Sequence, residues 1–422
     1  MFEIRISKTY YVTITYVIYL ILTLVFITDY SKRLYIWIFY LVAQIIFIFP
    51  IQKLRESLIA NSTVTKFFVL LLLHGILWTI GSIPSTLFSY SIEYARIYIP
   101  YVLCMWFTVT EFVVYDKVNT YIDVSYWCIA IYMIAVYIQN FNGFEVLRWV
   151  TKIFERYDRY RVTFGFASPD IAACLALCVI ICSMLRYNRC KKRQQIIMIF
   201  INAIMAIMIL STGCRSQFIA LLLIVGMKFY FALSHIEFKN LAQKIGIKTI
   251  KTVIIGAMVL GVINEYIKTT SLEEALTNSN RMGLFEVNIP LLIRTGKLLT
   301  GLVYASAGRF GEGRIGEYSL YYVDNYYVYL LMSSGLLGLA MDILAIYVVI
   351  HAVNKIVRPR NRQVAEILIT MIVINLVMGL FSCAVIYPNY VHCTIFWTIP
   401  LMYIVIYDKV EKVEKNEREL YC

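Results

Sequence analysis

The sequence predicts an all-α polytopic membrane protein with about 12 transmembrane helices. Hydrophobic residues make up 60% of the 422 residues and the mean hydropathy is +0.72. A soluble domain contains only about 45–50% apolar residues. Charged residues account for 15% of the chain, and they gather between long apolar runs instead of following helix faces. We therefore expect residues 1–422 to form a single integral membrane domain.

Each expected span is an apolar run close to the length that a membrane-crossing helix needs, about 20 residues with a range near 17–25. The first run is long for a signal-peptide core and lacks a small-residue cleavage site, so we expect it to remain as a span. The expected spans lie near residues 10–28, 34–51, 67–84, 95–115, 121–138, 166–185, 196–211, 217–234, 250–268, 325–352, 364–386 and 392–407.

Clusters of Lys and Arg predict the orientation of these spans. The clusters lie within residues 186–195, 239–251, 355–362 and 408–422. All four fall on one side when the spans alternate, and the positive-inside rule makes that side cytoplasmic, with both termini there. The net charge of +13 is thus explained by topology, and no nucleic-acid partner is expected.

The same topology predicts two long external loops. They cover residues 139–165 and 268–323, and the second connects the ninth and tenth spans. A tail at 408–422 is expected in the cytoplasm. Lys32 and Arg33 lie in the first external loop and are a small violation of the charge rule.

Arginine is concentrated in the external loops, where orientation does not require it. Arg215 stands apart in LSTGCRSQF, between two apolar runs, where a charge usually faces a cavity or a partner. A planar guanidinium suits bidentate binding of a diphosphate, although a helix-end anchor or a solvated surface is the alternative. The loop arginines are Arg148, Arg156, Arg159, Arg161, Arg281, Arg294, Arg309 and Arg314.

Other polar positions and the missing motifs narrow the chemistry. No DxD, Walker A, HExxH, GxSxG or CxxC motif occurs, and most of the ten Cys are expected to be small buried hydrophobes. The four His lie outside the long external loops. Thr212-Gly213 predicts a tight turn able to form an anion nest, and Pro169-Asp170 predicts a helix start. Asp342 and Glu111 are expected to be buried carboxylates that need partners.

The order of motifs resembles the O-antigen polymerase and O-antigen ligase superfamily of bacterial cell-envelope proteins. These motifs are RVTFGFASPDIAACLAL, ILSTGCRSQFIALLL, NSNRMGLF and DNYYVYLLMSSGLLGL, and they cover roughly residues 140–350. The family's Asn is Asp170 here, and its Thr-Gly-Ser-Arg step has Cys214 in place of Ser. Arg281 corresponds to the arginine that opens the large external loop.

The resemblance implies a metal-independent glycosyltransferase without a cofactor. Such a protein acts outside the bacterial plasma membrane, where a sugar hydroxyl displaces undecaprenyl diphosphate from a lipid-linked glycan. Membrane lipid, a flippase and chain-length regulators are the implied partners. The implied catalytic residues are Arg215, Arg281 and Asp324, and the implied substrate-binding residues are Arg159, Arg161, Tyr322 and Asn325.

Asp324 separates the two branches of the superfamily. The ligase branch has a His at this position, so the Asp favours a polymerase over a ligase. The carboxylate could act as a base or cap the helix that follows. A lipid-linked oligosaccharide flippase is a further alternative, but it predicts pseudo-symmetric halves and short external loops, and neither is visible. A scaffold without activity would not need Arg215 at membrane depth.

Overall fold

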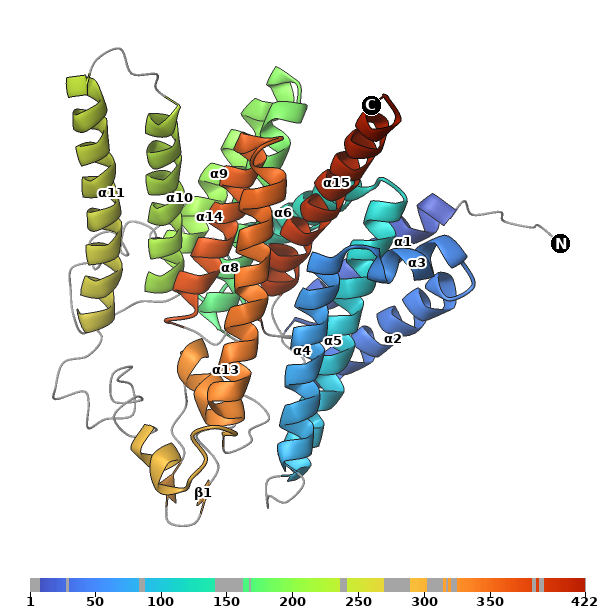
Figure 1. Cartoon of the computed structure of the whole chain (residues 1–422). Coiled ribbons are helices and arrows are strands. Elements are labelled where there is room, and N and C mark those ends of the chain that lie inside the picture. The colour runs from blue at the N-terminus through green and yellow to red at the C-terminus, as the bar shows by residue number, and fades with distance from the viewer. Residues whose placement is uncertain are drawn as a thin grey trace.

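The computed structural model shows a bundle of long helices with one very short β-ladder (Figure 1). It describes residues 8–27, 30–82, 88–140, 162–166, 168–235, 241–268, 289–301, 314–315, 318–319, 325–381, 385–386 and 391–421. Within these residues the ladder consists of β1 (Arg314–Ile315) paired antiparallel with β2 (Tyr318–Ser319).

The helices follow the apolar runs of the sequence. They are α1 (Lys8–Val25), α2 (Tyr30–Ile48), α3 (Gln52–Ala60), α4 (Ser62–Ser82), α5 (Phe88–Val114), α6 (Val118–Gln139), α8 (Pro169–Arg186), α9 (Lys192–Ser211), α10 (Arg215–Ser234), α11 (Leu241–Lys268), α13 (Tyr326–Ala352), α14 (Arg362–Met378) and α15 (Val391–Tyr421). Short helical turns at Tyr187–Arg189 and Val353–Val357 extend α8 and α13.

The fold is that of a polytopic membrane protein. Within the described residues, nine helices are long and apolar enough to cross a membrane, or up to ten if the bent pair α2 and α3 is one span. That pair is bent by 111° at the break between Ile48 and Gln52. A helix covers most of each expected apolar run, but the count of twelve spans and the long loop between the ninth and tenth stay predictions.

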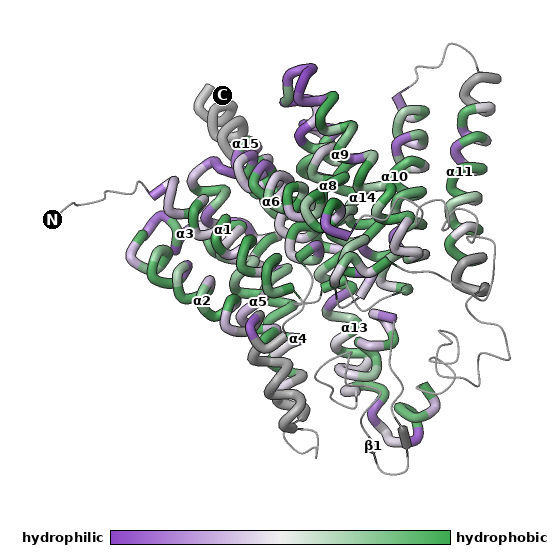
Figure 2. Tube along the Cα trace, turned by 180° about the vertical axis from the view of Figure 1, so that it is seen from behind, coloured by the Kyte–Doolittle hydropathy of each residue, from purple (hydrophilic) through white to green (hydrophobic). Residues whose placement is uncertain are grey.

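Polar contacts join helix ends at one end of the bundle, which we call the basic end. Arg186 on α8 pairs with Asp123 on α6 at 2.6 Å. Arg360, which precedes α14, pairs with Glu411 on α15 at 3.3 Å. Three of the four basic clusters thus contribute to one end, as the alternation of spans predicts; in Figure 1 this end is uppermost, beside the end of α15. Figure 2 shows hydrophilic residues at this end of α9 and hydrophobic residues along the helices.

The opposite end, which we call the loop end, carries residues 162–166 before α8, residues 212–214 between α9 and α10, and Asn325 before α13. The Val162 N–H donates to the Ser211 carbonyl, and the Tyr326 N–H donates to the Gly379 carbonyl. β1 lies at this end, lowest in Figure 1. The loop end therefore gathers the starts of α8, α10, α13 and α15.

The core lies between the helices that cross the middle of the bundle. α13 packs mainly on α4, α6 packs on α8, and α5 packs on α2, α4 and α15. The three cysteines on α8 are buried as predicted, Cys174 at 2% exposure and Cys178 and Cys182 at 0%. α11 is peripheral, since no residue of Gly246–Ile263 is buried. α15 continues to Tyr421, so much of the expected tail at 408–422 is helical.

Candidate functional site

Two predicted motifs meet at one corner of the loop end. The Val162 N–H, directly after Arg161 in the sequence, donates to the Ser211 carbonyl over 3.2 Å. Gln217, in the first turn of α10, is fully buried and its Nε2 donates to Cys174 Sγ on α8 at 3.3 Å. The RVTFG and STGCR motifs, far apart in the sequence, therefore lie side by side.

Local structure at this corner follows the sequence. Gly213 has φ 62°, which the tight turn before α10 requires and which glycine adopts without strain. α8 begins at Pro169, and Ser168 Oγ accepts from the Asp170 N–H at 3.3 Å. Both helices start at the same end, and helix N-termini carry a partial positive charge. The corner is therefore suited to an anionic ligand.

A buried amide fixes the start of α13. Asn325 Oδ1 accepts from the Tyr327 N–H at 3.0 Å and the Val328 N–H at 3.1 Å, and its Nδ2 donates to the Leu380 carbonyl at 3.1 Å. The cap considered for Asp324 is thus held by Asn325, which is completely buried. These bonds give Asn325 a structural role, and its contact with substrate stays a prediction.

α13 is interrupted two turns below its start, which the continuous run expected over 325–352 does not indicate. Gly335 has φ 65° and ψ −163°, a conformation close to glycine-only. The N–H groups of Leu336 and Leu337 donate to the carbonyls of Leu298 and Leu299, at 2.9 and 3.2 Å. The carbonyls of residues 298 and 299 therefore accept the first N–H groups of the second half of the helix, and Gly335 lies close to the backbone of this segment.

A chain of polar side chains spans the interruption and reaches α4. His74 Nδ1 lies 2.8 Å from Asp342 Oδ1, and His74 Nε2 lies 2.9 Å from Ser334 Oγ. The Tyr326 hydroxyl donates to the other oxygen of Asp342 at 2.5 Å. Asp342 thus has the partners that a carboxylate inside the bundle needs, and these partners join α4 to both halves of α13.

The serine, histidine and aspartate are arranged in the order of an activated nucleophile. Their burial assigns them a different role: Ser334 is 7% exposed, and His74 and Asp342 are each 1% exposed. The Ser334 hydroxyl also lies 3.0 Å from the Leu330 carbonyl of its own helix. We therefore interpret these contacts as structural: they fix α13 to α4 and hold the two halves of α13 together. The sequence identified Asp342 as a buried carboxylate in need of partners but did not identify His74. The position of His74 inside an apolar run could have indicated it as such a partner.

Most of the predicted site residues lie outside the described residues. These are Arg159, Arg161, Arg281, Tyr322 and Asp324. Arg215 is the first residue of α10, and Asn325 precedes α13, so both belong to the loop end. The catalytic and binding roles of all of these residues stay predictions.

The comparisons with known proteins add no relative. No family model matches the chain, and no curated protein matches its sequence. Within the part of the chain that the structure describes, no group of three or more His, Cys, Asp or Glu residues is placed to hold a metal ion. The class of protein is thus defined by the fold, as a helical membrane protein with a polar corner at its loop end.

Proposed function

We propose that this chain is a polysaccharide repeat-unit polymerase of the bacterial plasma membrane. The substrate is a glycan linked to undecaprenyl diphosphate, and the acceptor is a hydroxyl of a second sugar. The observation that carries the proposal is the hydrogen bond between Val162 and Ser211, because it joins the RVTFG and STGCR motifs at one corner. The resemblance to O-antigen polymerases supplies the reaction.

The reaction exchanges one bond to the anomeric carbon of the donor sugar. The acceptor oxygen forms a bond to this carbon, and the bond to the diphosphate oxygen breaks with its electron pair on the diphosphate. The acceptor proton passes to a base, for which Asp324 is the candidate. Arg215 and Arg281 stabilise the leaving diphosphate, as preorganised cations do where charge develops, and no metal takes part. Arg159 and Arg161 bind the donor beside them, with Tyr322 stacked on a sugar ring.

The proposal includes an orientation in the cell. The basic end faces the cytoplasm with both termini, because Lys and Arg accumulate on that side of bacterial membrane proteins. The loop end then faces outward, where lipid-linked repeat units arrive from a flippase. The product is O-antigen, capsule or exopolysaccharide, and a chain-length regulator is a natural partner.

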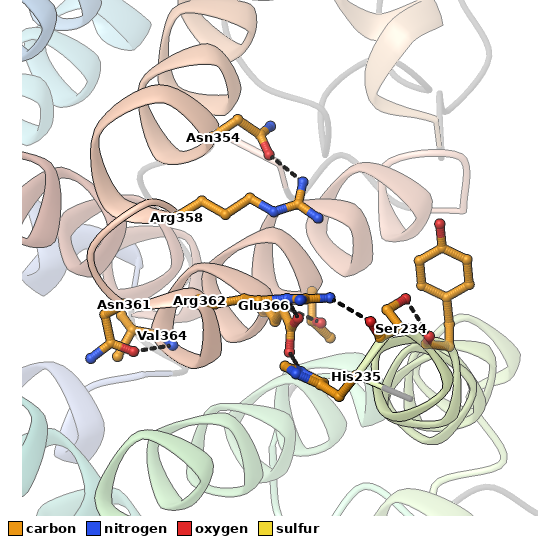
Figure 3. Close-up of polar contacts among 10 residues, drawn as sticks. Ser234, His235, Asn354, Arg358, Asn361, Arg362, Val364 and Glu366 are labelled. Atoms are coloured by element: carbon orange, nitrogen blue, oxygen red, sulfur yellow. Dashed lines mark hydrogen bonds and ion pairs between the residues drawn. The ribbon is translucent and has the colours of Figure 1, made fainter. Parts of the chain in front are cut away.

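Alanine variants of the two arginines test the assignment. Arg215→Ala and Arg281→Ala, expressed at the normal level, should reduce the surface glycan to a single repeat unit, because the leaving group loses its counter-charge. The matched control is Arg358→Ala at the basic end, where Nη1 of Arg358 donates to the exposed Asn354 at 3.2 Å and, among the described residues, to no carboxylate (Figure 3). Glycan length on gels is the readout, and full-length glycan in both the Arg215→Ala and the Arg281→Ala variant contradicts the assignment.

Deletion of the gene separates the proposal from its alternatives. A polymerase deletion leaves glycan of one repeat unit on the cell. Unattached long chains on the lipid carrier would instead identify a ligase, and loss of all surface glycan would identify a flippase.

A further inference from the structure

The basic end contains a cavity that the proposed polymerase reaction does not use. It has a volume of about 590 Å³ and lies among the ends of α8, α10 and α14 and the side of α9. Its polar lining includes Asn202, Lys228, His235, Glu366 and Thr370. Cavities between helices at the cytoplasmic side of a membrane, when they are basic, are sites for anionic lipid headgroups.

Asn202 lines the cavity, and its amide oxygen is a buried hydrogen-bond acceptor. Its Nδ2 donates to Ser183 Oγ at 2.7 Å, and Ser183 donates to the Ile180 carbonyl at 2.6 Å. Asn202 Oδ1 is buried, and no described residue donates to it. A buried acceptor without a partner is costly, so an occupant of this cavity should bring an O–H or N–H group.

The side chains in and beside the cavity carry a net positive charge, because Glu366 is paired with Arg362 and Lys228 remains. Both oxygens of Glu366 are engaged, one by Arg362 Nε at 3.0 Å and the other by His235 Nε2 at 3.1 Å (Figure 3). Arg362 Nη2 also donates to the Ser234 carbonyl at 3.0 Å, which fixes its position. Lys228 is exposed at the cavity, and within the described residues no carboxylate pairs with it. The cavity is therefore complementary to an anion.

An apolar wall continues from these polar groups. Phe231 and Ile367 line the cavity, and Ile199 on α9 lines it while 54% exposed. An exposed isoleucine on a membrane-length helix faces lipid, so the cavity reaches the hydrocarbon as well as the basic end. A water-soluble anion would leave this wall uncovered, whereas an acyl chain would cover it.

We propose that this cavity binds an anionic glycerophospholipid whose headgroup carries a hydroxyl, such as phosphatidylglycerol. The lipid phosphate accepts from Lys228 Nζ, the headgroup hydroxyl donates to Asn202 Oδ1, and an acyl chain lies along Ile199 and Phe231. The site belongs to the membrane leaflet at the basic end, and it does not depend on the reaction at the loop end.

Native mass spectrometry of the full-length protein in detergent tests the lipid class. Phosphatidylglycerol should bind about tenfold more tightly than phosphatidylcholine, because the choline ammonium cancels the negative charge that Lys228 attracts and has no O–H group to donate. Lys228→Gln should remove most of this preference. The matched control is Lys192→Gln, an exposed lysine at the same end that does not line the cavity. Equal binding of the two lipids, or equal effects of the two variants, overturns the proposal.

A second pair of probes tests the unmet acceptor. Phosphatidylmethanol has the phosphate charge of phosphatidylglycerol without the hydroxyl, so the wild-type protein should prefer phosphatidylglycerol and Asn202→Ala should not.

Glycerol phosphate has no acyl chain and tests for a soluble occupant. If glycerol phosphate displaces bound phosphatidylglycerol at a similar concentration, the site is one for free phosphate esters and the lipid proposal is wrong.

Discussion

Two histidine–carboxylate pairs in this protein have similar geometry and opposite surroundings. His74 and Asp342 lie 2.8 Å apart inside the bundle, with side chains 2% and 1% exposed. His235 and Glu366 lie 3.1 Å apart at the basic end, with side chains 48% and 9% exposed. The inner pair joins α4 to α13, and the outer pair joins the end of α10 to α14.

Burial decides what each pair contributes. Water and salt screen the outer pair, and pairs of that kind contribute about 0–1 kcal/mol. The inner pair is removed from water. If one partner is lost, the other polar groups stay buried without a hydrogen-bond partner, and this strongly destabilises the fold. The difference predicts that the inner pair controls stability, whereas the outer pair shapes the cavity beside it.

The largest effect is expected from Asp342→Ala. This change removes the acceptor that His74 and Tyr326 share, and it should lower the free energy of unfolding by about 3–5 kcal/mol. Denaturant unfolding in detergent, followed by tryptophan fluorescence, measures the loss. Asp342→Asn keeps one oxygen acceptor and should lose clearly less. The comparison fails if Asp342→Ala is no more destabilised than a variant of the outer pair.

An intermediate effect is expected from Gly335→Ala. The backbone there has φ 65°, and an added Cβ would overlap the Leu299 carbonyl. We expect a loss of about 1–3 kcal/mol, the range for a strained backbone, in the same unfolding experiment.

Gly261→Ala is the matched control, because a Cβ at Gly261 on α11 meets open space. Alanine favours a helix over glycine, so this control should gain up to about 1 kcal/mol. Equal stability of the two variants would show that the interruption of α13 carries no constraint.

The smallest effect is expected from His235→Ala. We expect a loss below about 1 kcal/mol at low salt, because the His235 side chain is 48% exposed and Glu366 keeps its contact with Arg362. Molar salt should reduce the loss further, since screening weakens exposed pairs. If His235→Ala lowers the free energy of unfolding as much as Asp342→Ala does, and salt does not change this loss, the two pairs do not differ as proposed.

The loop end shows how much of the candidate site the sequence predicted. Glycine at 213 and Pro169 fixed a turn and a helix start that the structure confirms, because both effects are local to the backbone. The sequence offers Asp324 as a capping residue of α13, but the structure shows that Asn325, one position later, caps the helix. Both residue types can cap a helix, so the sequence does not distinguish them. The contact between Asn325 and Leu380 depends on a distant segment and has no local signal.

The sequence alone determined the helical membrane class, the positions of the helices and the gathering of basic clusters at one end. These features depend on hydropathy and charge summed over neighbouring residues. Only the tertiary structure decided that His74 meets Asp342, that α13 breaks at Gly335 against residues 297–301, and that four helices enclose a cavity at Asn202. Each of these depends on which helices pack together, and helix packing brings together residues that no window of sequence contains.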